Sequence, residues 1–186
     1  MTSAAQQRVY EGLARRFYAG VYNYLRWLCR DADLAADLTQ QAFVQIWRHP
    51  PELRGEHPLK AWVYRVARNE YLQHQRRAGL RTVALDEGME AAGSDREAPD
   101  PQIRLEREEL RQAVRAGLDR LAPAYREAVV LHHMEGLSSV ETASVLGIPK
   151  GTVQSRCAKA FALLRQILAR EVGCDAMQPS SSEPSR

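Results

Sequence analysis

The sequence has few of the features that mark secreted, membrane-spanning or disulfide-linked proteins. Its 186 residues include three cysteines, which lie far apart and form no C-x-x-C pair, so we expect no disulfide framework. No run of about 18 apolar residues is present, which argues against membrane insertion. The opening stretch MTSAAQQRVYEGLARRF lacks the apolar core of a signal peptide. These absences together predict a cytoplasmic protein.

Sequence motifs for enzymatic chemistry are absent as well. The five histidines show no ligand spacing such as H-E-x-x-H, and no nucleophile elbow, phosphate-binding loop or dinucleotide fingerprint occurs. Acidic residues are numerous, but they fall on predicted helix surfaces or in a connecting segment, where solvation explains them. We therefore expect no metal, no cofactor and no enzyme activity.

The charges are unevenly distributed along the chain. Residues 1–79 hold 12 Lys and Arg against 7 Asp and Glu, and residues 105–173 hold 10 against 8. The segment between them, residues 80–104, holds 3 against 6. Two basic blocks joined by an acidic connector indicate two separate surfaces for a polyanion.

Apolar residues recur at helical spacing on both sides of this connector, and no strand pattern longer than a few residues occurs. The sequence therefore predicts an all-α protein with two small helical domains. The first, residues 1–79, has three helices, interrupted by CRDAD and by the proline-rich loop HPPELRGEHP. Residues 80–104 form a flexible linker, and residues 174–186, which include Cys174, form a disordered tail. The second domain, residues 105–173, has four helices, at about 105–121, 124–135, 139–146 and 150–171.

The last two of these helices have the pattern of a helix-turn-helix. Ser138 and Glu141 fit a capping box, which begins a helix whose buried side is expected to be Val140, Ala143 and Leu146. Gly147 is suited to the left-handed conformation that ends a helix, and Ile148 is placed to fill the angle between the helices. Pro149 suits the start of the next helix, because its missing N–H costs nothing there.

The final helix has an apolar face and a small, polar, basic face. Val153, Cys157, Ala160, Leu164 and Ile167 share one stripe, which we expect to be buried. The opposite side is rich in short side chains near the helix N-terminus, so the helix would fit the major groove of duplex DNA. The residues expected to contact DNA are Lys150, Thr152, Gln154, Ser155, Arg156 and Lys159. A helical hairpin with a solvated polar face is the alternative.

These residues also carry a family resemblance. The segment from Gly117 to Leu168, which contains SSVETASVLGIPKGTVQSR, closely resembles the C-terminal domain of extracytoplasmic-function (ECF) sigma factors of bacterial RNA polymerase. The stretches DLTQQAFVQIWRH and LKAWVYRVARNEYLQHQRR are similar to the N-terminal domain of that family, in the same order. The resemblance implies that the C-terminal domain binds the −35 promoter element as duplex. It implies that the N-terminal domain holds the non-template strand of the −10 element.

Further roles follow from the resemblance. It implies that core RNA polymerase is a partner, through its β′ clamp helices and β flap, and that an anti-sigma factor silences the protein and could hold it at the membrane. Docking on the clamp helices would involve Asp37, Gln40, Gln41 and Phe43. Contacts with the −10 strand would involve Arg54, Lys60, Trp62, Tyr64, Arg65, Arg68, Asn69, Arg76 and Arg77.

The chemistry of the third helix fits single-stranded DNA, which needs cations for phosphates and flat side chains for unstacked bases. Along this helix, apolar residues at helical spacing form one stripe, which is expected to face the core. Tyr64 falls outside this stripe and is the better candidate for stacking on a base. Trp62 falls on the stripe, so core packing is the alternative for its ring. The loop from Leu53 to His57 resembles the loop with which the family captures an extruded base. A plain polar loop is the alternative there.

The sequence departs from the family pattern at four positions. Ala36 stands where an acidic residue is frequent, and Gln73 stands where an aspartate is frequent. Gln154 and Phe161 replace cations on the last helix, which predicts an unusual −35 preference or weaker phosphate contacts. Two other functions remain open: a stand-alone helix-turn-helix regulator that binds duplex DNA without polymerase, and a helical adaptor that binds only proteins.

Overall fold

The computed structural model describes residues 3–49, 59–79 and 111–172, and all regular structure in these ranges is helical. The predicted all-α fold is confirmed. Three helices form what we call the N-terminal bundle: α1 (Ser3–Cys29), α2 (Ala32–Arg48) and α3 (Leu59–Arg77). The C-terminal bundle comprises the helical residues 111–119, α5 (Pro123–Val129), the π-helical turn η1 (Val130–Met134), α6 (Ser139–Leu146) and α7 (Lys150–Val172). The predicted linker, 80–104, and tail, 174–186, lie outside the described residues.

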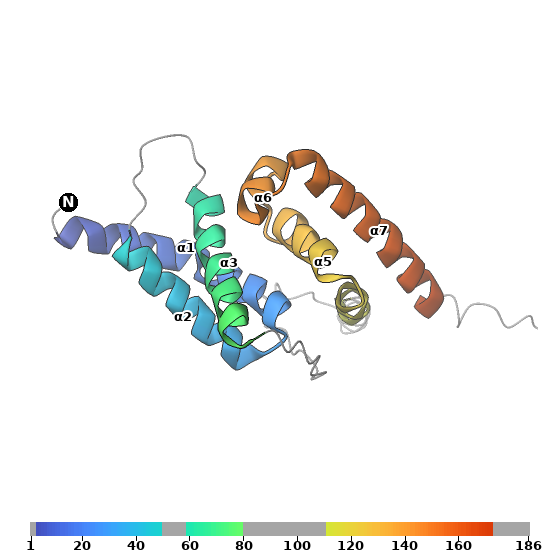
Figure 1. The fold of residues 1–186 in the computed structure, drawn as a ribbon, viewed down its shortest axis with the longest axis horizontal. Coiled ribbons are helices and arrows are strands. Elements are labelled where there is room, and N and C mark those ends of the chain that lie inside the picture. The colour runs from blue at the N-terminus through green and yellow to red at the C-terminus, as the bar shows by residue number, and fades with distance from the viewer. Residues whose placement is uncertain (1–2, 50–58, 80–110, 173–186) are drawn as a thin grey trace, which may run out of the picture.

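The two bundles lie against each other. Figure 1 shows α1–α3 on one side and α5–α7 on the other, with α6 next to the first turns of α3 and α7 on the outer side. α3 and α6 contact each other, and α1 contacts α5 and η1. Contact with the C-terminal bundle therefore determines which of the predicted site residues on α3 are accessible to solvent.

The N-terminal bundle closes around an apolar stripe along α1. Leu13, Phe17, Val21 and Leu25 recur every three or four residues along α1, and all four are buried. The second helix begins at a cap, because Asp31 Oδ1 accepts hydrogen bonds from the backbone N–H groups of Asp33 (2.9 Å) and Leu34 (3.0 Å). This cap fixes the rotation of α2, so that Leu38, Ala42 and Ile46 face the core.

The C-terminal bundle differs from the prediction in one helix. A single helix was expected over about 124–135, but the helix changes to a π-helical turn at Val130. The N–H of Glu135 bonds to the carbonyl of Val130 at 2.9 Å, a five-residue step that the periodicity of apolar residues does not show. This wider turn ends at Glu135, and both its carboxylate and its carbonyl contact α3.

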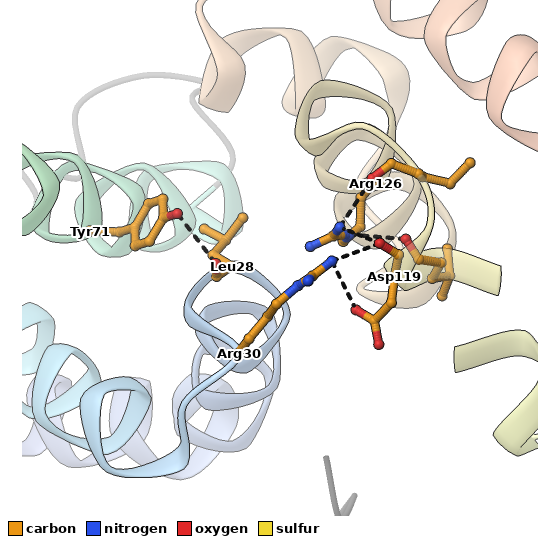
Figure 2. Close-up of polar contacts among 7 residues, drawn as sticks. Leu28, Arg30, Tyr71, Asp119 and Arg126 are labelled. Atoms are coloured by element: carbon orange, nitrogen blue, oxygen red, sulfur yellow. Dashed lines mark hydrogen bonds and ion pairs between the residues drawn. The ribbon is translucent and has the colours of Figure 1, made fainter. Parts of the chain in front are cut away.

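A buried arginine holds the start of the C-terminal bundle together. Arg126 is 6% exposed, and its guanidinium donates to the carbonyls of Leu118 (3.0 Å), Asp119 (2.9 Å) and Leu121 (3.0 Å). Leu118 and Asp119 end the helix at 111–119 and Leu121 lies just beyond it; the Leu118 carbonyl also accepts the N–H of Leu121 at 3.1 Å, so the guanidinium adds to the C-terminal cap. Figure 2 shows Arg126 and Arg30, which comes from the end of α1, converging on Asp119.

Candidate nucleic-acid interface

The helix-turn-helix forms as the sequence predicts. Ser138 Oγ accepts from the N–H of Glu141 at 3.2 Å, and Glu141 Oε2 accepts from the N–H of Ser138 at 2.7 Å, which completes the capping box. Gly147 ends α6 in the left-handed conformation, with φ at 67°. The carbonyl of Pro149 accepts the N–H of Thr152 at 2.9 Å, which closes the first turn of α7.

One detail of α6 was predicted wrongly. Val140 was expected on the buried side, but it is 61% exposed, and the buried residues are Thr142, Val145 and Leu146. The buried set is fixed by the rotation that the Ser138 cap imposes and by packing against α3 and α7. A helix of eight residues makes just over two turns, so an apolar residue in its first turn does not settle which face is buried.

The conformation of Gly147 gives a first prediction. An alanine there would be held at positive φ, which costs about 1 kcal/mol of folding free energy. Gly151 is a matched control, because a Cβ at this position would meet nothing within 4 Å and its backbone lies in α7. Gly147→Ala should lower the free energy of unfolding by about 1 kcal/mol, and Gly151→Ala should leave it unchanged or raise it. Urea titrations followed by circular dichroism compare the two; equal stabilities would contradict the prediction.

The predicted reading face of α7 lies on the surface. The expected stripe is inside: Val153, Cys157, Ala160 and Leu164 are buried, and Ile167 is half-buried. Of the opposite face, Lys150, Gln154, Ser155 and Lys159 are exposed, while Thr152 and Arg156 are half-buried.

Two side chains of this face already have partners. Ser155 Oγ donates to the carbonyl of Thr152 at 3.0 Å, and the ammonium of Lys159 lies 5.7 Å from the centre of the Tyr125 ring. The other long polar side chains in the first turns of α7 are Lys150 and Gln154, which are exposed, and Arg156, which is half-buried.

Phe161, a departure from the family pattern, belongs to a ring cluster. Its ring lies edge-to-face with the His133 ring at 4.7 Å, and His133 lies 4.5 Å from the His132 ring. Burial, followed by the neighbouring His132, lowers the pKa of His133, so the neutral imidazole is favoured. Phe161 is 43% exposed, so this ring contact lies on the surface of the C-terminal bundle.

The residues predicted to hold the −10 strand divide into two groups. Asn69, Arg76 and Arg77 are exposed along α3, and Trp62 is half-buried. Arg54 and the rest of the Leu53–His57 loop lie outside the described residues. The other members contact the C-terminal bundle, and they are Lys60, Tyr64, Arg65 and Arg68.

The prediction that Tyr64 lies outside the core is wrong. The side chain is 2% exposed, with its ring 5.6 Å from the buried Tyr24 ring and its hydroxyl donating to Glu135 Oε2. Burial, followed by the charge of Glu135, raises the pKa of Tyr64. The helical spacing of apolar residues in α3 does not indicate that Tyr64 is buried, because a second bundle packs on that side of the helix.

The predicted polymerase-docking residues of α2 are not all on the surface. Asp37, Gln40 and Gln41 are exposed, but Phe43 is 2% exposed and packs against the rings of Tyr10 (6.3 Å) and Tyr18 (5.2 Å). The free protein therefore does not present Phe43, which corrects its place in the predicted docking set.

Two apolar residues that sequence reasoning missed are exposed on the same helix. Val44 is 45% exposed and Trp47 is 39% exposed. Val44 follows Gln40 by four residues and Trp47 follows Val44 by three, so the helical spacing from Gln40 would have indicated them. The exposed face of α2 is thus partly polar and partly apolar.

The described residues offer no metal site and no membrane span. Among residues 3–49, 59–79 and 111–172, no group of three or more His, Cys, Asp or Glu side chains is placed to hold a metal ion. Within the same ranges, no helix has the length and apolar character needed to cross a bilayer.

The described residues form two helical bundles, and the C-terminal bundle carries a helix-turn-helix with an exposed polar face. Residues 13–81 match the sigma-70 region 2 family, and residues 111–164 match the sigma-70 region 4 family. The ECF RNA polymerase sigma-E factor of Escherichia coli is 32% identical over 130 residues, which make up 67% of this chain and 68% of that protein. The chain belongs to the ECF sigma factors, which are transcription initiation factors without catalytic activity.

Other relatives agree with this assignment. The ECF RNA polymerase sigma factor SigE of Mycolicibacterium smegmatis is 33% identical over 164 residues. The match covers 87% of this chain but 62% of that protein, so this chain spans less than two thirds of its length.

Two solved structures share the fold. The sigma factor RpoE of Bartonella quintana, solved with the anti-sigma factor NepR, superposes with a TM-score of 0.67 at 23% identity, covering 87% of this chain and 97% of that one. CnrH, solved with the cytosolic domain of CnrY, gives a TM-score of 0.62 at 23% identity, covering 89% of this chain and 90% of that one.

Proposed function

We propose that this chain binds core RNA polymerase, recognises the −35 and −10 elements of a specific set of promoters, and starts transcription there. One observation carries the proposal: a complete helix-turn-helix with an exposed polar face is combined, in one chain, with a region 2 bundle. A stand-alone regulator would need no such bundle. An adaptor that binds only proteins would need no small, polar, basic face on α7.

The duplex −35 element is assigned to the start of α7. Lys150 and Lys159 supply charge for phosphates, and Gln154 and Arg156 supply hydrogen bonds for base edges. A cation is frequent in the family at the position of Gln154. We therefore expect the −35 preference of this protein to differ from that of its relatives chiefly through this residue.

The −10 strand is assigned to α3 and to the loop before it. Asn69, Arg76 and Arg77 are exposed and supply hydrogen bonds and charge, while the loop residue Arg54 is assigned from the family resemblance alone. Trp62 is half-buried and supplies the accessible ring. Tyr64 is not part of this assignment while the two bundles are in contact.

Docking on the β′ clamp helices is assigned to α2. Asp37, Gln40 and Gln41 are exposed there, and the neighbouring Val44 and Trp47 add the apolar area that a protein interface uses in its centre. The C-terminal bundle would contact the β flap. The site of action would be cytoplasmic, at the nucleoid.

Control by an anti-sigma factor is part of the proposal. Two proteins of the same fold were solved in complex with such a factor or with a cytosolic partner domain. The same exposed faces of α2 and α7 would be covered in the silenced state, and a membrane-anchored partner would hold the protein at the membrane.

Replacement of a single side chain tests the −35 assignment. Arg156→Ala should weaken the binding of polymerase carrying this protein to its promoter by about 5- to 150-fold, which corresponds to the roughly 1–3 kcal/mol of a bidentate base contact. Arg165→Ala is the matched control, because Arg165 is exposed further along the same helix. Binding is measured on duplexes with every single −35 substitution; an unchanged preference in Arg156→Ala would remove this residue from base recognition.

A further inference from the structure

The side chains next to Gln154 on the exposed face of α7 are short. Gly151 lies one turn before it and Ala158 one turn after it, Ser155 follows it directly, and all four residues are exposed. A Cβ on Gly151 would meet nothing within 4 Å, so the space beside this turn is open. α7 itself lies on the outer side of the C-terminal bundle (Figure 1). Gln154 therefore stands on a surface that lets the helix backbone come close to a partner.

The amide of Gln154 has no hydrogen-bond partner among the described residues. Two other polar side chains of this face differ in that respect. The Ser155 hydroxyl donates to the carbonyl of Thr152 at 3.0 Å, and the ammonium of Lys159 lies 5.7 Å from the centre of the Tyr125 ring. The donor and the acceptor of the Gln154 amide are thus both available to a ligand.

A glutamine amide presents a hydrogen-bond donor and an acceptor side by side. In the major groove, adenine presents the matching pair, the N7 acceptor and the N6 donor, so one amide forms two hydrogen bonds with it. Guanine presents two acceptors there, N7 and O6, and the amide oxygen would face one of them. Cytosine offers a donor and thymine an acceptor, so each leaves half of the amide without a partner. Adenine is therefore the base that this side chain distinguishes best.

The amide differs chemically from the cation that is frequent at this position in the family. An arginine guanidinium carries donors only, so it pairs with the two acceptors of guanine. An amide that donated only to a phosphate would add affinity without any base preference. Charge for phosphates is supplied by Lys150, which is exposed one turn before Gln154. With that cation beside it, the neutral amide is free to contact a base edge.

We propose that Gln154 selects an adenine in the −35 element through a bidentate contact in the major groove. The proposal rests on the function proposed above and narrows it to one base pair. Exchange of this adenine for another base should weaken the binding of polymerase carrying this protein by about 5- to 150-fold, which corresponds to the roughly 1–3 kcal/mol of such a contact.

The experiment measures base preference rather than affinity, because a charged residue at position 154 changes the salt-dependent attraction to any duplex. Core polymerase carrying the full-length protein is mixed with duplexes whose −35 region is randomised, and the bound duplexes are sequenced. The wild type should enrich adenine at one position. Gln154→Arg should enrich guanine at that same position, and Gln154→Glu should shift it towards cytosine, whose N4 group a carboxylate accepts.

Two further variants serve as controls. Gln166 is an exposed glutamine further along the same helix, so Gln166→Arg adds the same charge outside the first turns of α7. It should keep the wild-type preference at every −35 position. Gln154→Ala should lose the adenine preference at one position and keep the preferences at all others. Because both side chains are exposed, all variants should fold as the wild type does, which circular dichroism checks.

An unchanged base preference in Gln154→Arg and Gln154→Ala would overturn the inference while leaving the proposed function in place. A wild type that enriches guanine, cytosine or thymine at the position affected by Gln154→Ala would overturn the adenine assignment. If neither the wild type nor any variant enriches a −35 sequence, the proposed function fails together with the inference.

Discussion

Replacing Arg126 with methionine is expected to lower the free energy of unfolding by about 1–3 kcal/mol, because the Leu121 carbonyl loses its donor, while the carbonyls of Leu118 and Asp119 keep only the Leu121 N–H and Arg30. The guanidinium reaches the carbonyls of Leu118 and Asp119 at the end of the helix at 111–119 and that of Leu121 just beyond it. Methionine matches the arginine stem as far as Nε but has no N–H group, so the packing of the stem is largely kept while the hydrogen bonds are lost.

The charge of Arg126 is retained at some cost. Burial, followed by the nearby Arg30, lowers the pKa of Arg126, since both disfavour the protonated form. The carbonyls at the helix end offset this cost, because the negative end of a helix attracts a cation. Arg126→Lys should recover little stability, since one ammonium group does not reproduce the planar fork of the guanidinium.

Urea titrations followed by circular dichroism measure this effect. Arg165→Met on α7 is the matched control, since its side chain is exposed, and it should change the unfolding free energy by less than about 0.5 kcal/mol. A loss below about 1 kcal/mol in Arg126→Met would show that water satisfies these carbonyls in the variant.

Core RNA polymerase is expected to raise the affinity of this protein for a promoter fragment by about 100- to 10,000-fold. In the proposed function, the free protein has two small DNA-binding surfaces, and the C-terminal bundle covers part of the one on α3. Binding through the α7 surface alone would be weak and steeply dependent on salt. Polymerase would hold the two surfaces at the spacing of the promoter elements, so that the second contact forms at high effective concentration.

Fluorescence anisotropy with a duplex carrying both elements, at one fixed salt concentration, measures this increase. A duplex with a scrambled −35 element serves as the control and should lose most of the gain. Equal binding by the free protein and by its complex with core polymerase would contradict the prediction. That result would favour a stand-alone helix-turn-helix regulator.

Local sequence signals predicted the helix-turn-helix well. The Ser138 and Glu141 cap, the left-handed Gly147 and the buried stripe of α7 all depend on neighbours within a few residues. The same is true of the cap at Asp31. Such features are determined before the two bundles meet.

Contacts between distant segments were not predictable in the same way. Tyr64 is buried by a bundle that begins 47 residues later in the described chain, at Arg111, and Phe43 is covered by aromatic rings of α1. The acidic residues were interpreted as solvated, but Glu127 and Glu135 each accept hydrogen bonds across the two bundles. Helical periodicity describes one face of one helix, so it does not indicate where a second bundle packs.

Run-off transcription tests the central claim most directly. Purified bacterial core polymerase is combined with a promoter library, with and without this protein, and the transcripts are sequenced. We predict that the protein causes initiation on a small subset of templates that share a −35 and a −10 sequence, and that core polymerase alone transcribes none of this subset specifically. No stimulation on any template, while the protein is folded and binds duplex DNA on its own, would contradict the account.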